Sequence, residues 1–147
     1  MMIYRDGVGV EAGFDINMDA SITQTLPLIP KDKTVYCIGH SRGAGRAWIR
    51  AQRLIRLGYK VAVVVFGSPR PGDSAIATIL KGAVKISSYC NGKDPICRVP
   101  FFIPKLAGFI EPSPFIMLNV PPDQDDEWGH EMGWHHVEHY QKGLSNG

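Results

Sequence analysis

The sequence has few of the features that mark disulfide-rich, metal-binding, nucleic-acid-binding or membrane-spanning proteins. Only three of its 147 residues are cysteines (Cys37, Cys90 and Cys97), and no two of them form a CxxC pair. A disulfide framework and a zinc knuckle are therefore not expected, although a bridge between Cys90 and Cys97 stays open. The formal net charge of +2 is too small to indicate a nucleic-acid partner. No apolar run reaches the roughly 18 residues that span a bilayer, so stable membrane insertion is not expected.

The N-terminus, MMIYRDGVGV, also lacks the long apolar stretch of a signal peptide. We therefore expect a cytoplasmic protein. A chain of 147 residues is long enough to bury a real core and favours one domain, over residues 1–147. Cys37 lies in an apolar, strand-like run, which predicts a buried thiol.

What the sequence does contain is an alternation of strand-like and helix-like segments. Residues 34–38 (TVYCI) are rich in β-forming residues, and residues 60–66 (KVAVVVF) form a continuous apolar run. Between them, residues 44–57 have apolar positions at helical spacing, and Gly58 closes this helix. The alternation predicts parallel strands connected by helices.

The rest of the chain extends this pattern. Residues 73–81 predict a short helix and residues 84–89 a third strand, which completes two βαβ units in an α/β fold with helices on the sheet faces. Residues 98–126 are Pro-rich and apolar, and we assign them no regular structure. Residues 137–144 predict a last short helix.

The first helix carries arginines on the side opposite its apolar positions. They recur at Arg46, Arg50, Arg53 and Arg56. Such a stripe is usually a solvated surface, and that is our interpretation. A role in binding an anion or a membrane surface is the alternative.

A serine stands where the first strand-like run ends, in the segment VYCIGHSRGAG. In an open parallel sheet, ligands bind beyond the carboxyl ends of the strands, and Ser41 is at that edge. Together with His40 and Arg42, the glycines Gly39 and Gly43 complete the pattern G-x-S-x-G of a nucleophile elbow, a sharp strand-to-helix turn that needs small neighbours. Such a turn exposes the serine hydroxyl and places the next backbone N–H, that of Arg42, to face an oxyanion.

Other uses of these glycines fit less well. A P-loop needs its second glycine where Ala44 stands, and a dinucleotide fingerprint that begins at Gly43 needs a small residue where Trp48 stands. Taken alone, the elbow pattern is still compatible with a purely structural turn.

A serine nucleophile needs a base and an orienting carboxylate, which follow it in the order Ser, Asp/Glu, His in elbow folds. Asp94 lies in the turn-rich stretch NGKDP directly after the third strand, at the same sheet edge as Ser41. Its alternative interpretation is an ordinary turn aspartate. Asp73 is the competing carboxylate, but it starts a helical segment and is predicted to be a helix N-cap.

The base is expected among the histidines near the end of the chain: His130, His135, His136 and His139. A metal site is not predicted there. The pattern H-E-x-x-H fails because Trp134 stands where the second histidine would be, and His135 and His139 have no clearly spaced third ligand. Histidines that take no part in catalysis are interpreted as surface residues.

With these residues in place, the chain resembles the class 3 lipases, a family of α/β-hydrolases. Three blocks carry the likeness: VYCIGHSRGAGRAWIRAQRL, VVVFGSPRPGDSAIA and YCNGKDPICRVP. A weaker fourth block, residues 10–14 (VEAGF), is similar to the family's "H-x-GF" segment. The resemblance implies a compact α/β-hydrolase-like fold of reduced size, with a mostly parallel sheet and helices on both faces. It implies Ser41 as the nucleophile, Asp94 as the triad acid, and neither a metal nor a cofactor.

The resemblance also makes the base a choice between two neighbours. In small members the histidine is followed by a Tyr five residues on and a Leu nine residues on. His135 fits this spacing, with Tyr140 and Leu144, and His136 is the alternative base.

The chain departs from the family pattern in two respects. Only about ten residues precede Glu11, whereas full-length members have there a strand and loop that supply the second oxyanion donor. That donor is expected to be missing, or to come from this short arm or another subunit. There is also little room for a long lid helix. An acyl-binding wall or simple core packing is expected from an apolar group: Phe101, Phe102, Ile103, Leu106, Phe109, Ile110 and Phe115.

Two hypotheses of different kinds follow. The first is a serine hydrolase that cleaves carboxylic esters, lipid or small-molecule, through a Ser-His-Asp triad and an acyl-serine. The second is a catalytically inactive hydrolase-fold module for binding or assembly. A homodimer is compatible with either hypothesis, because a shortened sheet exposes an edge. Acyl transfer and the cleavage of thioesters or amides share the acyl-serine and stay open.

Overall fold

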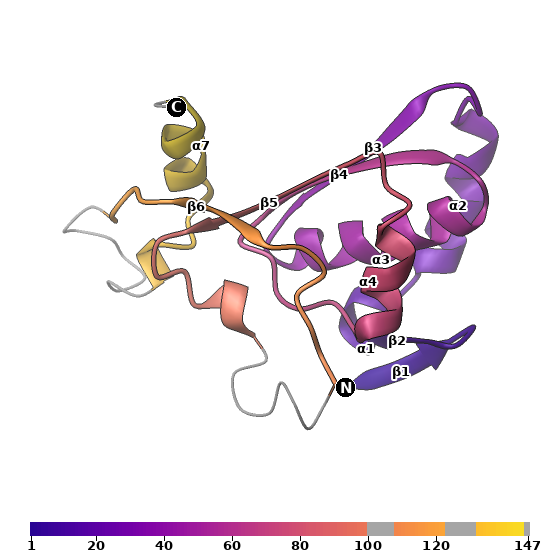
Figure 1. The fold of residues 1–147 in the computed structure, drawn as a ribbon, viewed down its shortest axis with the longest axis horizontal. Coiled ribbons are helices and arrows are strands. Elements are labelled where there is room, and N and C mark those ends of the chain that lie inside the picture. Colours follow the sequence, from indigo (N-terminus) through magenta and orange to yellow (C-terminus); the bar gives the residue numbers. More distant parts are fainter. Residues whose placement is uncertain (100–107, 123–131, 146–147) are drawn as a thin grey trace.

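The structure, a computed structural model, describes residues 1–99, 108–122 and 132–145. Its centre is a four-stranded sheet with the order β3-β4-β5-β6, in which all neighbours are parallel (Figure 1). The strands are β3 (Thr34–His40), β4 (Lys60–Phe66), β5 (Lys85–Asn91) and β6 (Phe115–Leu118). The parallel pairing of the first three strands confirms the predicted βαβ units. β6 shows that our prediction of no regular structure over residues 98–126 is wrong. The prediction missed this strand because four residues are too few to show a recognisable period.

Two helices connect the first three strands. α3 (Arg42–Arg56) joins β3 to β4, and α4 (Ser74–Leu80) joins β4 to β5. The carboxylate of Asp73 accepts a hydrogen bond from the Ala75 N–H at 2.9 Å, which confirms Asp73 as the N-cap of α4. Gly58 has a φ of +81°, a left-handed conformation that suits the end of α3.

Shorter elements complete the fold at both ends of the chain. The N-terminal segment contains an antiparallel hairpin of β1 (Met2–Arg5) and β2 (Val8–Glu11), followed by α1 (Ala12–Asp15), α2 (Met18–Thr25) and the 3-10 turn η1 (Leu26–Leu28). After β5 come a 3-10 turn, η2 (Ile96–Arg98), and the helix α7 (Val137–Ser145), which confirms the predicted last helix.

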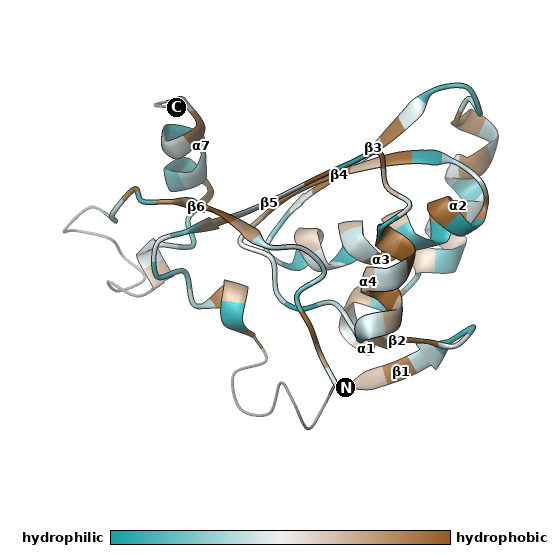
Figure 2. Ribbon diagram, in the orientation of Figure 1, coloured by the Kyte–Doolittle hydropathy of each residue, from teal (hydrophilic) through white to brown (hydrophobic). Residues whose placement is uncertain are grey.

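The hydrophobic core lies between the sheet and α3. Three large side chains of α3 are fully buried, namely Trp48, Ile49 and Leu54, and they share one cluster with Val61, Val63 and Val65 of β4. The indole N–H of Trp48 donates to Ser68 Oγ at 2.8 Å, so this large ring is buried with its polar atom paired. Figure 2 shows hydrophobic residues along the strands of the sheet and hydrophilic residues at the β1–β2 turn.

Helices flank both faces of the sheet, but they cover its strands unequally. α3 and α4 lie on one side, whereas α7 lies on the other side next to β5 and β6 (Figure 1). Because side chains alternate along a strand, Cys37 points inward and is buried, while Tyr36 and Ile38 point the other way and are each 63% exposed. Among the described residues, this face of β3 is therefore left uncovered.

All three cysteines are buried and free, so the bridge between Cys90 and Cys97 is not formed, and the prediction of a buried Cys37 is confirmed. Burial raises the pKa of the Cys37 thiol to about 11.

Within the part of the chain that the structure describes, no helix is both long and apolar enough to cross a membrane.

The arginine stripe of α3 contacts the N-terminal segment, so the predicted solvated surface is wrong for Arg46, Arg50 and Arg53, whereas Arg56 is exposed. Arg46 Nη1 donates to the backbone oxygen of Ile16 at 2.8 Å. Arg50 Nη1 donates to Ser21 Oγ at 3.1 Å. Both guanidinium groups therefore hold the start of the chain against α3, and helical periodicity alone could not reveal such distant acceptors.

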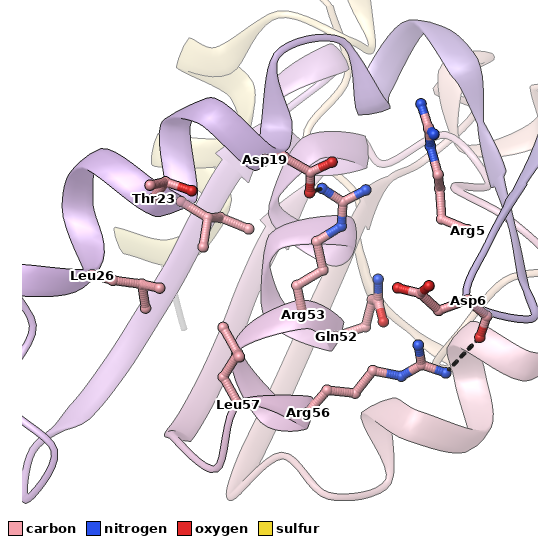
Figure 3. Close-up of a pocket in the computed structure, with 10 residues that line it drawn as sticks. Arg5, Asp6, Asp19, Thr23, Leu26, Gln52, Arg53, Arg56 and Leu57 are labelled. Carbon is pink, nitrogen blue, oxygen red and sulfur yellow. Dashed lines mark hydrogen bonds and ion pairs between the residues drawn. The ribbon is translucent and has the colours of Figure 1, made fainter.

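The second half of the stripe extends this contact as a charged network. Arg53, with a side chain only 13% exposed, forms ion pairs with Asp15 and Asp19. Arg56 donates to the backbone oxygen of Asp6 at 3.2 Å. Figure 3 shows Arg53 beside Asp19 and Arg56 beside Asp6 around a cavity of about 460 Å³. The four arginines thus bind the hairpin turn, α1 and α2 to α3.

Candidate active site

Ser41 occupies the turn between β3 and α3 in a conformation that is rare for a residue with a side chain. Its φ of 56° and ψ of −127° lie outside the regions that sterics favour. The Ser41 N–H donates to the Phe66 backbone oxygen at the end of β4, at 3.0 Å. The hydroxyl does not cap α3. The backbone is thus held in a sharp strand-to-helix turn, and the hydroxyl is not engaged in ending or starting the helix.

Steric crowding requires a glycine at only one of the two glycine positions of the elbow. A Cβ at Gly39 would lie 2.3 Å from the Gly43 backbone oxygen, so any larger residue would push the strand and the helix apart. A Cβ at Gly43 would meet no atom within 4 Å. Our expectation that both glycines make room for the turn therefore holds for Gly39 and is wrong for Gly43.

Asp94 is a fully buried carboxylate at the same end of the sheet, after β5. Its Oδ1 accepts a hydrogen bond from the Ile96 N–H at 2.8 Å. Its Oδ2 accepts one from His135 Nδ1 at 2.8 Å and another from the Tyr140 hydroxyl. Burial by itself would raise the pKa of Asp94, but the hydrogen bonds from His135 and Tyr140 outweigh it and hold the pKa below its usual value. The carboxylate is therefore kept ionised without being in water.

His135 lies against this carboxylate just before α7. It is only 8% exposed, and its bond to Asp94 requires that Nδ1 carry the proton, because an ionised carboxylate can only accept. In the neutral ring Nε2 then keeps its lone pair, and this buried atom has no hydrogen-bond partner among the described residues. Such a tautomer is the one a general base needs. The geometry supports His135 over His136, since Asp94 Oδ2 contacts the former.

A glycine lets these groups meet. Gly67 follows β4 with a φ of +53°, and a Cβ there would lie 2.7 Å from Asp94 Oδ2 and 2.8 Å from His135 Nδ1. The residue before it, Phe66, accepts the hydrogen bond from the Ser41 N–H. The end of β4 is therefore the common neighbour of Ser41, Asp94 and His135.

The structure does not place a hydrogen bond between the serine and the histidine. Among the described residues, the Ser41 hydroxyl makes no hydrogen bond, and His135 Nε2 makes none either. In unliganded enzymes the hydrogen bond between nucleophile and base is often long and shortens only when substrate binds. Its absence here is therefore compatible with a Ser41–His135 pair.

Neither Tyr140 nor Asn91 was predicted as a functional residue, and His40 was predicted only as part of the elbow pattern. Tyr140 served only as a spacing landmark, yet its hydroxyl binds Asp94. His40 stacks on His135, with ring centroids 4.6 Å apart, and burial together with His135 lowers the His40 pKa. Asn91 Nδ2 donates to the Trp134 backbone oxygen at 3.2 Å. No sequence signal marks these roles, except that a Tyr at fixed spacing after the histidine suggests a partner in the site.

Some sequence expectations lie outside the described residues. These are His130 and the first part of the apolar group, namely Phe101, Phe102, Ile103 and Leu106. Of the remaining members, Phe109 is buried and Phe115 begins β6. Within the described ranges, no group of three or more His, Cys, Asp or Glu side chains is placed to hold a metal ion.

Replacing Tyr140 by phenylalanine is expected to destabilise the protein more at neutral pH than at about pH 3. A carboxyl group with a depressed folded-state pKa contributes stability above its unfolded-state pKa, and this stability is lost as the pH falls through the folded-state pKa. Removal of the Tyr140 hydroxyl shifts the Asp94 pKa back toward its unfolded value. The loss in unfolding free energy is therefore about 2 kcal/mol at neutral pH and smaller in acid.

Urea unfolding of Tyr140→Phe and the wild type at both pH values measures this difference. Tyr36→Phe is the control, because the Tyr36 side chain is 63% exposed, and we expect it to change neither value. A loss of equal size at both pH values would show that the hydroxyl does not act through an ionised Asp94.

Comparison with known proteins identifies the family. Residues 6–103, about two thirds of the chain, match the family profile "Lipase (class 3)". No curated protein sequence matches the chain. Among solved structures, a mutant form of MDLA from Penicillium cyclopium is 20% identical, with a TM-score of 0.68 over 98% of this chain and 61% of its own.

Two further fungal structures are similar. The mono- and diacylglycerol lipase from Aspergillus oryzae is 22% identical, covers 84% of this chain and 48% of its own, and has a TM-score of 0.68. The triacylglyceride lipase from Rhizomucor miehei is 20% identical, covers 82% of this chain and 49% of its own, and has a TM-score of 0.62. The chain thus spans less than two thirds of these structures. Their likeness confirms the α/β-hydrolase-type fold in reduced size, and by its profile match the chain belongs to the class 3 lipase family.

Proposed function

We propose that the protein hydrolyses carboxylic esters, with Ser41 as nucleophile, His135 as general base and Asp94 as the acid that orients it. The observation that carries this proposal is the buried hydrogen bond between His135 Nδ1 and Asp94 Oδ2, at 2.8 Å, beside a strained serine turn. A structural aspartate in a turn does not require a buried histidine partner. The two groups together make an imidazole whose Nε2 lone pair is ready to accept a proton.

The proposed reaction has two half-steps. Ser41 Oγ attacks the ester carbonyl carbon while His135 Nε2 takes the hydroxyl proton, and the carbonyl oxygen becomes an oxyanion. The Arg42 N–H and the positive end of the α3 dipole stabilise that charge. The intermediate collapses, His135 gives its proton to the leaving alcohol, and an acyl-serine is left. Water, deprotonated by His135, then attacks the acyl carbon. As this second intermediate collapses, His135 returns the proton to Ser41 Oγ, and the carboxylic acid and the free serine are released.

Asp94 acts throughout by holding the imidazole. Its Oδ2 keeps the proton on Nδ1 before the reaction and faces the imidazolium cation during it. Because Ile96 and Tyr140 also donate to this carboxylate, its position does not depend on the histidine alone.

The family and its solved structures support an ester of lipid type as substrate. The A. oryzae structure is a mono- and diacylglycerol lipase, and another matched structure is a triacylglycerol lipase whose catalytic centre is formed by a serine protease triad. For this chain, a lipid or small-molecule carboxylic ester is our proposed substrate, and no cofactor is required by the chemistry.

Covalent labelling tests the proposal. The purified protein is incubated with a fluorophosphonate and, separately, with p-nitrophenyl butyrate, and the labelled peptide is located by mass spectrometry. We expect hydrolysis and a single adduct on Ser41, both absent in Ser41→Ala. No adduct and no hydrolysis would contradict the proposal and favour an inactive hydrolase-fold module for binding or assembly.

A further inference from the structure

His40, the residue before the nucleophile, contacts the proposed base in two ways. Its ring stacks on the ring of His135, with centroids 4.6 Å apart and planes at 26°. Its Nε2 also lies 2.8 Å from the backbone oxygen of His135. A carbonyl oxygen can only accept, so His40 Nε2 must carry a proton and donate it. The nucleophile's own strand therefore holds both the ring and the backbone of His135.

The segment that presents His135 is tied to the sheet through its backbone carbonyls. It is a short turn ahead of α7, in which the His135 N–H donates to the Met132 oxygen at 2.9 Å. The carbonyl of Trp134 accepts from Asn91 Nδ2 at 3.2 Å. Two consecutive carbonyls, those of Trp134 and His135, are thus held by side chains at the ends of β5 and β3. Side chains at the ends of two strands of the sheet therefore hold this loop.

We propose that His40 is a positioning residue, which sets the distance between the nucleophile and the base by fastening the backbone of His135 to the end of β3. This inference rests on the proposed function. His40 and Ser41 are adjacent in the chain, and the Ser41 backbone is fixed by its hydrogen bond to Phe66. A movement of the histidine loop away from the serine must therefore break the bond between His40 Nε2 and the His135 oxygen.

The position of the base matters because proton transfer is sensitive to distance. Asp94 fixes one atom of the His135 ring, Nδ1, and that single contact still permits the ring to pivot about it. The bond from His40 to the His135 carbonyl and the stacked face of its ring together remove this freedom. A misplacement of about 1 Å in an active site can lower the rate by about 100-fold.

Three substitutions separate the donor of His40 from its ring. His40→Gln keeps an N–H donor at the place of Nε2 but has no ring. His40→Phe keeps a ring but has no donor, and His40→Ala has neither. We expect kcat for p-nitrophenyl butyrate to fall by about 10- to 100-fold in the Phe and Ala variants with KM unchanged, and to be largely retained in His40→Gln. Thermal unfolding shows whether each variant is folded.

Two results would overturn the inference. The first is a His40→Phe variant with wild-type kcat. The second is a His40→Gln variant that is folded and as slow as His40→Phe, since the donor would then not matter.

A second readout keeps this test separate from that of the proposed function. The Nδ1 proton of His135 is followed by NMR in the wild type and the three variants. We expect its resonance to persist in His40→Gln and to broaden or vanish in His40→Phe. If the wild type hydrolyses no ester, the proposed function fails, but the resonance still reports whether His40 holds His135. An unchanged resonance in all three variants would refute the positioning role.

Discussion

Replacing His135 by alanine is expected to reduce kcat for ester hydrolysis by about 10⁴-fold or more. The reason lies in the geometry: His135 presents a buried Nε2 lone pair, fixed by the bond from its Nδ1 to Asp94. Without that base, the Ser41 hydroxyl keeps its proton and is a poor nucleophile near neutral pH. Initial rates with p-nitrophenyl butyrate and the rate of fluorophosphonate labelling at Ser41 both measure this loss.

His136→Ala is the matched control, because it removes an imidazole from the next position in the chain. His136 is the alternative base, and its ring is not the one bonded to Asp94. We expect its kcat to stay within about threefold of the wild type. The opposite pattern, a slow His136 variant and an active His135 variant, would transfer the role of base to His136.

Asp94→Asn is expected to lower kcat by about 10⁴-fold while the protein stays folded. The neighbours of the carboxylate decide how the new amide lies. The Ile96 N–H needs an acceptor, so the amide oxygen takes the place of Oδ1 and the NH₂ group takes the place of Oδ2. That NH₂ group donates to His135 Nδ1, which moves the imidazole proton to Nε2. His135 Nε2 then already carries a proton and can no longer accept one from the Ser41 hydroxyl.

The tautomer can be measured directly, by the nitrogen chemical shifts of His135 in the wild type and in Asp94→Asn. Asp73→Asn is the matched control, because asparagine also caps helices and Asp73 caps α4. We expect it to leave kcat and the His135 tautomer unchanged. A shifted tautomer with normal kcat in Asp94→Asn would remove Asp94 from the proposed mechanism.

The sequence predicted those parts of the fold that depend on local pattern and on the topology of parallel sheets. The continuous apolar run at 60–66 is typical of a covered strand, and the helical spacing of 44–57 indicates a helix that packs on the sheet. Carboxyl ends of parallel strands meet at one edge, which is why Ser41 and Asp94 could be expected together. By contrast, β6 is too short and too exposed to have a recognisable period.

The contacts that the sequence did not reveal are those between polar side chains and distant groups. The Tyr140 hydroxyl binds a carboxylate 46 residues away, and no periodicity records such a pairing. Arg53 is a second example. Its place on the polar side of a helix predicted contact with solvent, but its partners are Asp15 and Asp19. Hydrophobic spacing says which side of a helix is buried in the core, but not what lies against its other side.

The arginine stripe has a consequence for α3, the helix that follows the proposed nucleophile Ser41. Arg46, Arg50, Arg53 and Arg56 lie three or four residues apart, so on a bare helix neighbouring positive charges would repel one another at close range. The carboxylates and carbonyls of the N-terminal segment neutralise or solvate these charges. The N-terminal segment therefore supplies the counter-charges of the helix that follows Ser41. Because these contacts are partly ionic, we expect high ionic strength to weaken the attachment of the N-terminal segment to α3.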